Sequence, residues 1–421
     1  MTKYLGFDFG TSNTSVAYMS EGRVINIALD PEVFTTPTSV FFDFAAKKML
    51  IGAEANNALI GGLEGRYMRA LKSVLGTTLM QEKRLFLGKR LDFYDIITDF
   101  IVHVKKRAET SSHITFDHVL AGRPVFFHSE NTEKDIAAEK DLRECFSRAG
   151  FTHIEFMHEP EAAAFAAAKN IPDGAIGLVV DIGGGTSDFT VFQMQDHKIK
   201  IIASNGLRLG GTDFDRIISF DYFMPLLGRG SDLKRHFAKG YIQAPAHIFA
   251  ELATWEKIPF LYDQKTKQLA DSLARDAAQP HLFERLLKVL ELRMGHDLAF
   301  LAEDTKISLN QTPLQNPQQF SVDMGFIEQH LKVEIAPNSM DTTLGGFEKR
   351  IVQAIMVTLK NGNIDAKDVT KVIPVGGSSS MIIVKRAIQN CLPNAIIQSE
   401  AIFTSIVDGL AIRGGQLETG Q

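Results

Sequence analysis

The stretches LGFDFGTSNTSVAYM (Leu5–Met19) and VVDIGGGTSDFTVFQM (Val179–Met194) are two versions of one pattern. Each reads as an apolar strand that ends on an aspartate, a tight turn rich in glycine and hydroxyl residues, and a second strand. The two aspartates, Asp8 and Asp181, lie 173 residues apart. A match over this separation predicts two structural repeats of domain size, each presenting an acid beside a glycine turn.

The composition limits which classes of protein the chain can belong to. A chain of 421 residues is too long for one core, so several domains are expected. The net charge of −5 offers no basis for binding nucleic acid or an anionic membrane. The two cysteines, Cys145 and Cys391, lack metal-type spacing and favour a reducing compartment. The N-terminus has no signal-peptide pattern and no apolar run is long enough for a membrane span, so we expect a cytoplasmic protein.

Regular elements are predicted between and after the repeats. Asp117–Val125, which contains the unusual GRPV, reads as a buried strand, and Thr132–Ala149 reads as an amphipathic helix. Glu159-Pro160 opens an alanine-rich helix, and Ile171–Gly174 is a turn that could act as a hinge. Beyond the second repeat, the chain from about 213 to 310 is predicted to be largely helical.

Three further predictions concern the second half of the chain. LGGTDF (Leu209–Phe214) is a glycine turn before a helix. The longest helix of the region is expected to run from about His281 to Leu309. Val369–Val375 is a buried strand that ends in a second glycine pair, Gly376-Gly377.

The glycine turns suit the chemistry of phosphoryl transfer. Glycine lets backbone N–H groups approach phosphate oxygens closely, and two carboxylates suit a hydrated Mg²⁺ ion. The candidate phosphate-binding residues are Gly10, Thr11, Ser12, Asn13, Gly183, Gly184, Gly185 and Thr186, and the candidate metal ligands are Asp8 and Asp181. The alternative is that each turn is only a hairpin turn, but the pattern occurs twice. The absence of GxxxxGK[ST] excludes a P-loop enzyme.

These motifs resemble those of the heat shock protein 70 (DnaK-like) family, within the superfamily of actin, sugar kinases and chaperone ATPases. The two repeats resemble its phosphate loops, and Glu159-Pro160 with the following alanines resembles its connecting segment. Arg69-Ala70-Leu71-Lys72 resembles the segment that carries the catalytic lysine. Residues 40–115, 220–300 and the GRPV at Gly122 depart from the usual pattern and are most similar to the bacterial YegD type.

The resemblance implies roles for particular residues. Asp8 and Asp181 would hold the hydrated metal, and Lys72 and Glu159 would orient the attacking water and stabilise charge. Thr186 and Asp188 would lie near the γ-phosphate and a monovalent cation, K⁺. Alternatively, Lys72 is a solvated helix lysine, Glu159 an acid at a helix N-terminus, and Asp188 an ordinary turn acid.

The nucleoside contacts follow from the same resemblance. The implied residues are Glu303, Lys306, Gly376, Gly377 and Ser378, and Gly210 and Gly211 of the LGGTDFD motif are further cofactor-binding candidates. The sequence departs from the family here, because the two arginines that normally sandwich adenine are replaced by Ile307 and Ser380, which removes a cation–π clamp. Glu303 and Lys306 could also be a surface pair three residues apart on a helix.

The predicted fold is an α/β, two-lobed, actin-like ATPase fold in which each lobe has a ribonuclease-H-like core with smaller inserted subdomains. Lobe I would take residues 1–172 with the C-terminal helix 400–421, and lobe II residues 173–399, with a helical subdomain at about 213–310. The chaperones carry a peptide-binding domain joined by an acidic, leucine-rich linker. No such segment follows in this sequence, so the ATPase module alone is expected.

Three hypotheses for function remain at this stage. The first is an Mg-dependent ATPase of the chaperone family that signals through lobe angle. The second is a sugar-kinase-like phosphotransferase, for which the sequence offers no identifiable base. The third is a nucleotide-gated regulatory module with little turnover. The protein client or co-chaperone and the oligomeric state cannot be read from the sequence.

Overall fold

The computed structural model describes residues 3–29, 33–128, 131–167, 171–196, 198–235, 239–311, 320–336, 339–398 and 404–419. Contacts divide the chain into two compact units, which we describe separately. The first unit comprises 1–210, 351–380 and 384–421, and the second comprises 211–350 and 381–383. Within the described residues, no helix is long and apolar enough to span a membrane.

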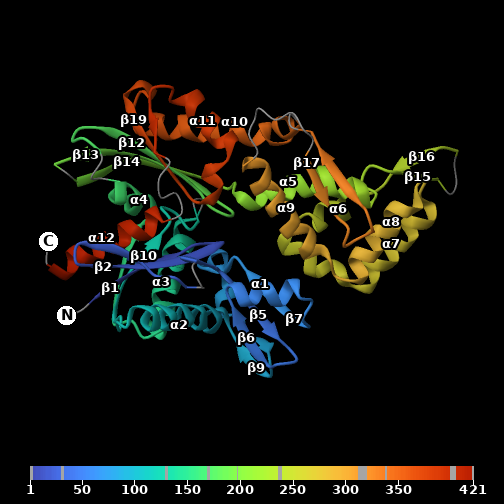
Figure 1. The fold of residues 1–421 in the computed structure, drawn as a ribbon, viewed down its shortest axis with the longest axis horizontal. Helices are drawn as coiled ribbons and strands as arrows, with labels where there is room; N and C mark the ends of the chain where they lie inside the picture. Colours follow the sequence, from blue (N-terminus) through green and yellow to red (C-terminus); the bar gives the residue numbers. More distant parts are fainter. Residues whose placement is uncertain are drawn as a thin grey trace. The chain divides into compact units, whose positions relative to one another are not determined.

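The first unit contains two large mixed sheets (Figure 1). The first sheet has the order β11-β10-β1-β2-β3, with β4 paired to β2; its strands are β1 (Tyr4–Phe9), β2 (Asn13–Ser20), β3 (Arg23–Asn26), β4 (Thr35–Pro37), β10 (His118–Arg123) and β11 (His153–His158). The second sheet has the order β14-β13-β12-β19-β20; its strands are β12 (Ile176–Ile182), β13 (Ser187–Gln195), β14 (Lys198–Leu207), β19 (Val369–Val375) and β20 (Ile396–Ile397).

The two sheets share one topology. In the first, β1 pairs antiparallel with β2 and β2 with β3, while β1, β10 and β11 run parallel. In the second, β12 pairs antiparallel with β13 and β13 with β14, while β12, β19 and β20 run parallel. The predicted repeat is therefore confirmed at the level of topology, and the fold is the two-lobed α/β ATPase architecture with a ribonuclease-H-like core repeated.

Helices cover both faces of the first sheet. The helices of this unit are α1 (Ala53–Ile60), α2 (Phe93–Ser112), α3 (Thr132–Arg148), α4 (Glu159–Ala167), α11 (Ile382–Cys391), α12 (Ser405–Thr419) and the end of α10 (Ser339–Asn361). Alternate side chains of β1, Phe7 and Phe9, pack with Phe100 of α2 and Phe146 of α3 in one core. Residues 400–403 and 420–421 of the predicted C-terminal helix lie outside the described residues.

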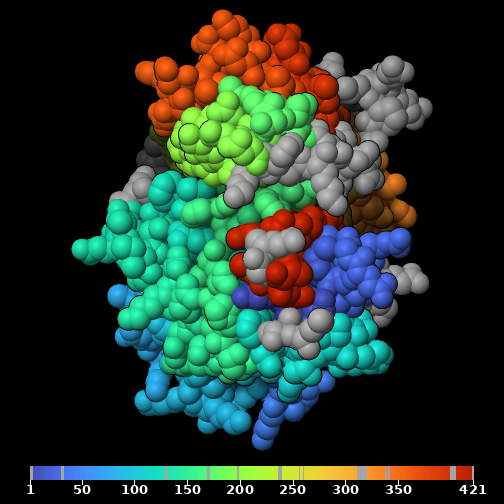
Figure 2. All heavy atoms as spheres, turned by 90° about the vertical axis from the view of Figure 1, so that its left-hand side faces the viewer, coloured from blue at the N-terminus to red at the C-terminus, as the bar shows by residue number. Residues whose placement is uncertain are grey.

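A second core lies between the two sheets. Helices α4 and α12 pack against each other, and α12 packs along β1 and β2. Ala163 of α4 and Leu410 of α12 join Leu120 of β10 and Val179 of β12 in this core. On the face shown in Figure 2, α12 (red) reaches the surface beside the N-terminal strands (blue). The alanine-rich sequence of α4 is therefore used for close packing between sheets.

A smaller sheet and a hairpin complete this unit. They comprise β5 (Ser39–Asp43), β6 (Lys48–Ile51), β7 (Gly65–Arg69), β8 (Arg84–Phe86) and β9 (Lys89–Leu91). Helix α1 packs on β5. The strand β7 leads directly into the segment that carries Lys72.

The second unit is mainly helical, as predicted for residues 213–310. Its elements are α5 (Gly211–Ile218), β15 (Asp232–Lys234), β16 (Tyr241–Gln243), α6 (Ala246–Leu252), α7 (Gln264–Asp276), α8 (Pro280–Glu291), α9 (Gly295–Gln311), β17 (Phe320–Asp323) and β18 (Lys332–Ile335). The prediction of a single helix from His281 to Leu309 is wrong. Two helices replace it, because Arg293 adopts a left-handed backbone with φ of 58° between α8 and α9.

Candidate functional site

The two glycine turns of the first unit touch each other. A Cβ atom built on Gly184 would lie 2.1 Å from Oγ of Ser12, so the second turn approaches the first more closely than any side chain allows. Gly210, from the LGGTDF turn, lies behind the second turn, since its Cβ would lie 2.4 Å from the Gly184 carbonyl oxygen. Ser187 Oγ donates to the Leu209 carbonyl at 2.6 Å and joins the same two turns. The glycines thus permit three backbone segments to meet at one point.

The paired aspartates occupy equivalent positions in the two sheets. Asp8 lies opposite Ser15 in the β1–β2 ladder, and Asp181 lies opposite Asp188 in the β12–β13 ladder. Ser15 is therefore the counterpart of Asp188 in the first repeat. Gly376 follows β19 with φ of 79°, and its Cβ would lie 3.0 Å from Oδ1 of Asp181, so this glycine leaves the carboxylate room.

Lys72 and Glu159 form a buried ion pair. The Lys72 ammonium donates to Oε1 of Glu159 at 2.6 Å, and the two side chains are only 9% and 10% exposed. Lys72 lies on a 3₁₀ turn (Leu71–Val74) after β7, and Glu159 is the first residue of α4. Gly122 of β10 lies against Glu159, because its Cβ would lie 3.2 Å from Cγ of that glutamate.

The electrostatics of this cluster are strongly perturbed. Burial and the charge of Glu159 raise the pKa of Asp8 and of Asp188 to about 7 each, against the opposing effect of Lys72. Burial, Glu159, Asp188 and Asp8 raise the pKa of Asp181 well above its usual range. Burial alone lowers the pKa of Lys72, but the charges of Glu159 and Asp8 outweigh it, so the net shift is upward. Perturbed groups of this kind gather at functional sites.

Four acids therefore interact electrostatically with one ammonium in the first unit, and Glu159 is in direct contact with it. The excess negative charge favours a cation, and carboxylate oxygens are the ligands that Mg²⁺ prefers. Among the described residues, no three acids, histidines or cysteines are arranged to hold a metal directly. This donor set fits Mg²⁺, because that ion usually keeps several waters and binds through one or two carboxylates together with substrate phosphates.

The remaining predicted residues are distributed over both units. Gly10, Thr11, Ser12, Asn13, Gly183, Gly185 and Thr186 form the two turns, and Gly377 and Ser378 belong to the 3₁₀ turn after β19. Gly211, Glu303 and Lys306 belong to the second unit, on α5 and α9. The Lys306 ammonium lies 2.8 Å from Oδ1 of Asp215, so Lys306 pairs with α5 and not with Glu303. Ile307 is 46% exposed, consistent with a side chain that faces outward.

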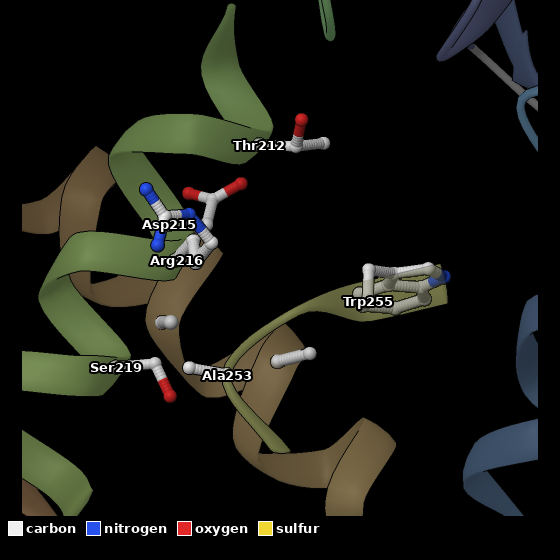
Figure 3. A pocket seen from close by; sticks show the side chains of 8 residues that line it. Thr212, Asp215, Arg216, Ser219, Ala253 and Trp255 are labelled. Carbon is white, nitrogen blue, oxygen red and sulfur yellow. The ribbon is translucent and has the colours of Figure 1, made fainter. Parts of the chain in front are cut away.

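A small pocket lies beside the Lys306–Asp215 pair in the second unit. Thr212, Asp215 and Arg216 project from α5, and Trp255 lies on the opposite wall (Figure 3). Ala253, Ala299, Ala302 and Ser219 complete the lining. Sequence reasoning did not bring Asp215 and Trp255 together, because Asp215 directly follows the LGGTDF turn whereas Trp255, the chain's only tryptophan, lies far along the sequence.

Comparison with known proteins identifies the family. The family model described as Hsp70 protein matches residues 4–236, which is more than half of the chain. The chain belongs to the Hsp70 family. The matched span includes both glycine turns, Lys72, Glu159 and Gly210 of this Hsp70 chain. Glu303, Lys306 and Gly376–Ser378 lie beyond the matched span.

Curated relatives agree with this assignment. The chain is similar to the chaperone protein HscA homolog of Rickettsia prowazekii (strain Madrid E), with 27% identity over 229 residues, 51% of this chain and 37% of the relative. It is equally similar to the HscA homolog of Rickettsia felis (strain ATCC VR-1525 / URRWXCal2), where the match covers 34% of the relative. The match thus spans about a third of the length of these Hsp70-family relatives. Similarity to the YegD type stays a prediction.

Proposed function

We propose that this chain binds ATP with Mg²⁺ at the two glycine turns and hydrolyses the γ-phosphate. The observation that carries the proposal is the buried Lys72–Glu159 pair, 2.6 Å apart, in the electrostatic reach of Asp8, Asp181 and Asp188. A solvated lysine or an acid serving only a helix dipole has no reason to be buried in this way. Membership of the Hsp70 family supports the same assignment.

The backbone of the turns provides the phosphate site in this proposal. N–H groups of Gly10–Asn13, Gly184 and Gly185 would face the phosphate oxygens, since these segments meet without intervening side chains, whereas the Gly183 N–H donates to the Thr186 carbonyl at 2.9 Å and closes the second turn. Asp8 and Asp181 hold the metal through its waters. A bound Mg²⁺ ion supplies neutralisation of the charge on the phosphates.

Glu159 and Lys72 act on the attacking water. Glu159 would accept a hydrogen bond from that water and orient it, while Lys72 would hold the Glu159 side chain in place and offer a positive charge to the phosphate oxygens. Thr186 is exposed on the second turn and lies close in sequence to Asp188, which suits contact with the γ-phosphate and a K⁺ ion. Positioning and charge stabilisation are the contributions that this reaction needs from a protein.

The nucleoside is proposed to lie against Gly376, Gly377 and Ser378, with Glu303 and Lys306 contacting the adenosine and Gly210 and Gly211 as further nucleotide contacts. We propose further that residues 1–172 with 400–421 and residues 173–399 act as two lobes about a hinge at Ile171–Gly174. ATP and ADP would then favour different lobe angles and so regulate a protein client or co-chaperone in the cytoplasm.

The test is ATP turnover by the wild-type protein, Lys72→Ala and Asp181→Ala, with and without candidate sugars. The proposal predicts slow Mg-dependent hydrolysis that both substitutions reduce by about a hundredfold or more. Turnover that appears only with a sugar would instead indicate a phosphotransferase. ATP binding without turnover under any condition would indicate a regulatory module.

A further inference from the structure

Asp141 is a charged residue on the apolar face of α3. Its neighbours on that face, Ala138, Leu142 and Cys145, are all buried, and Asp141 itself is only 9% exposed. A buried carboxylate is costly unless hydrogen bonds compensate for the water it loses. Its partners therefore indicate what this acid holds in place.

The partners of Asp141 come from two other segments. Its Oδ2 atom accepts a hydrogen bond from the backbone N–H of Gly76 at 2.8 Å. Its Oδ1 atom accepts a short hydrogen bond from the Tyr94 hydroxyl of α2. Arg148 of α3 lies over the Tyr94 ring at 4.9 Å and fixes the phenol in turn. Helices α2 and α3 thus jointly hold Gly76.

Gly76 ends the short segment that carries Lys72. The segment begins at Ala70, which is left-handed with φ of 56°, and continues through the 3₁₀ turn Leu71–Val74. Gly76 has φ of 74°, and its Cβ would lie 2.2 Å from the Lys134 carbonyl oxygen of α3. The segment therefore rests directly on the backbone of α3, in a conformation that favours glycine.

Local hydrogen bonds close the Lys72 turn: the Ser73 hydroxyl donates to the Ala70 carbonyl at 2.7 Å, and the Thr77 N–H and hydroxyl donate to the Val74 carbonyl at 3.1 and 2.6 Å. Ser73 N–H donates to Ala70 at 2.9 Å, and Leu75 N–H donates to Lys72 at a long 3.4 Å. The Leu75 carbonyl is bonded instead to Nε2 of His128 at 2.7 Å. Since a single 3₁₀ turn is weak, its position depends on the bonds that reach it from outside.

We infer that Asp141 is a positioning residue for Lys72. By holding the Gly76 N–H, it fixes the end of the turn and keeps the Lys72 ammonium at Glu159. The inference rests on the proposed function, in which Lys72 acts on ATP. Because misplacement of a catalytic group by about 1 Å can cost a hundredfold in rate, this anchor has consequences for turnover.

The experiment is a double-mutant cycle on kcat and KM for ATP, using Asp141→Ala, Lys72→Ala and the double variant. Asp141→Ala is expected to lower kcat about ten- to hundredfold and to leave KM within about twofold. The double variant is expected to be no slower than Lys72→Ala, because Asp141 acts through that lysine. Asp141→Asn is expected to keep most activity, since its carbonyl can accept from Gly76.

The control is Lys140→Ala, which removes an exposed charged side chain from the same helix. It is expected to turn over ATP like the wild type. Tyr94→Phe serves as a second variant where Asp141→Ala folds poorly, and it is expected to lower kcat by a smaller factor. A kcat for folded Asp141→Ala equal to that of the wild type overturns the inference. The inference is also overturned if Asp141→Ala lowers kcat by the same factor in the Lys72→Ala background as in the wild type.

A second measurement separates this inference from the proposed function. Acylation of individual lysines, followed by mass spectrometry, reports how accessible the Lys72 ammonium is without any turnover. Asp141→Ala is expected to speed labelling of Lys72 severalfold and to leave the exposed Lys134 unchanged. If the wild type hydrolyses no ATP, the proposed function fails, and this labelling alone decides whether Asp141 positions Lys72. An unchanged labelling rate of Lys72 in Asp141→Ala contradicts the inference that Asp141 positions Lys72.

Discussion

At the scale of single residues, the acids of the site determine how the protein responds to pH. Asp8 and Asp188 each have a pKa of about 7 in the folded chain, whereas an aspartate in an unfolded chain titrates near pH 4. Between these values the folded state binds more protons than the unfolded state. The free energy of unfolding therefore falls as pH rises, with a slope of about 1.4 kcal/mol per pH unit for each extra proton.

Asp188→Asn is expected to reduce this dependence in protein kept free of Mg²⁺ and nucleotide. The amide has no charge to bury, so the variant should be more stable than the wild type at pH 8 and lose less stability between pH 5 and 7. Urea denaturation in EDTA across this range measures the slope. Asp117→Asn, at an exposed acid just before β10, is the control and should keep the wild-type slope. If Asp188→Asn keeps the wild-type slope of unfolding free energy against pH, the raised pKa of Asp188 is contradicted.

The sequence predicted the main residues of the cluster but not those that support it. Asp8 and Asp181 were visible because they repeat with their glycine turns. Lys72 and Glu159 came from resemblance, and their proximity became visible only in the fold, where the 3₁₀ turn after β7 brings Lys72 to the first residue of α4. Asp141 carries no motif, since a single acid in an amphipathic helix looks like a surface residue until its face is known.

At the scale of elements, close packing of α12 on α4 joins the two sheets. A Cβ on Gly409 of α12 would lie 1.8 Å from the Ala162 carbonyl oxygen of α4. Backbone atoms cannot move aside as a flexible side chain can. The approach of these two helices therefore depends on a residue without a side chain.

Gly409→Ala is expected to lower the free energy of unfolding by about 3 kcal/mol, the upper end for overpacked cores. Gly345→Ala in α10 is the matched control, because nothing lies within 4 Å of its Cβ. That variant should be neutral or gain up to about 1 kcal/mol from helix propensity. Chemical denaturation of both proteins provides the comparison. Equal stability of the two variants rules out the tight α4–α12 contact.

Helix boundaries were predicted less well than strands. The apolar period continues from α8 into α9, so the sequence indicated one helix, and only the left-handed Arg293 separates them. Helix α3 was closer to expectation: it begins at Thr132 as predicted, with Asn131 as its N-cap accepting from the Lys134 N–H at 2.9 Å, and it ends at Arg148, one residue early. The strands of the two repeats were easier to predict because they are apolar runs bounded by glycine, an acid or a turn, whereas the short strands β6–β9 and β15–β18 were not predicted.

At the scale of the whole molecule, the second unit has a hydrophobic core of its own. Phe223, Phe249 and Phe283 belong to that core and to none of the cores described for the first unit. A segment with its own core can unfold as a separate cooperative unit. Scanning calorimetry without nucleotide is expected to resolve two transitions. A single two-state transition, with equal calorimetric and van't Hoff enthalpies, contradicts this expectation.

The central claim is that the two acid–glycine turns together hold ATP with Mg²⁺. The most direct measurement is the calorimetric affinity for ATP, with Mg²⁺ and with EDTA, for the wild type, Asp8→Asn and Asp181→Asn. We predict Mg-dependent binding by the wild type and a loss of about tenfold or more in each variant, which corresponds to at least about 1.4 kcal/mol. Absence of binding to the wild type, or equal affinity in all three proteins, would contradict the claim.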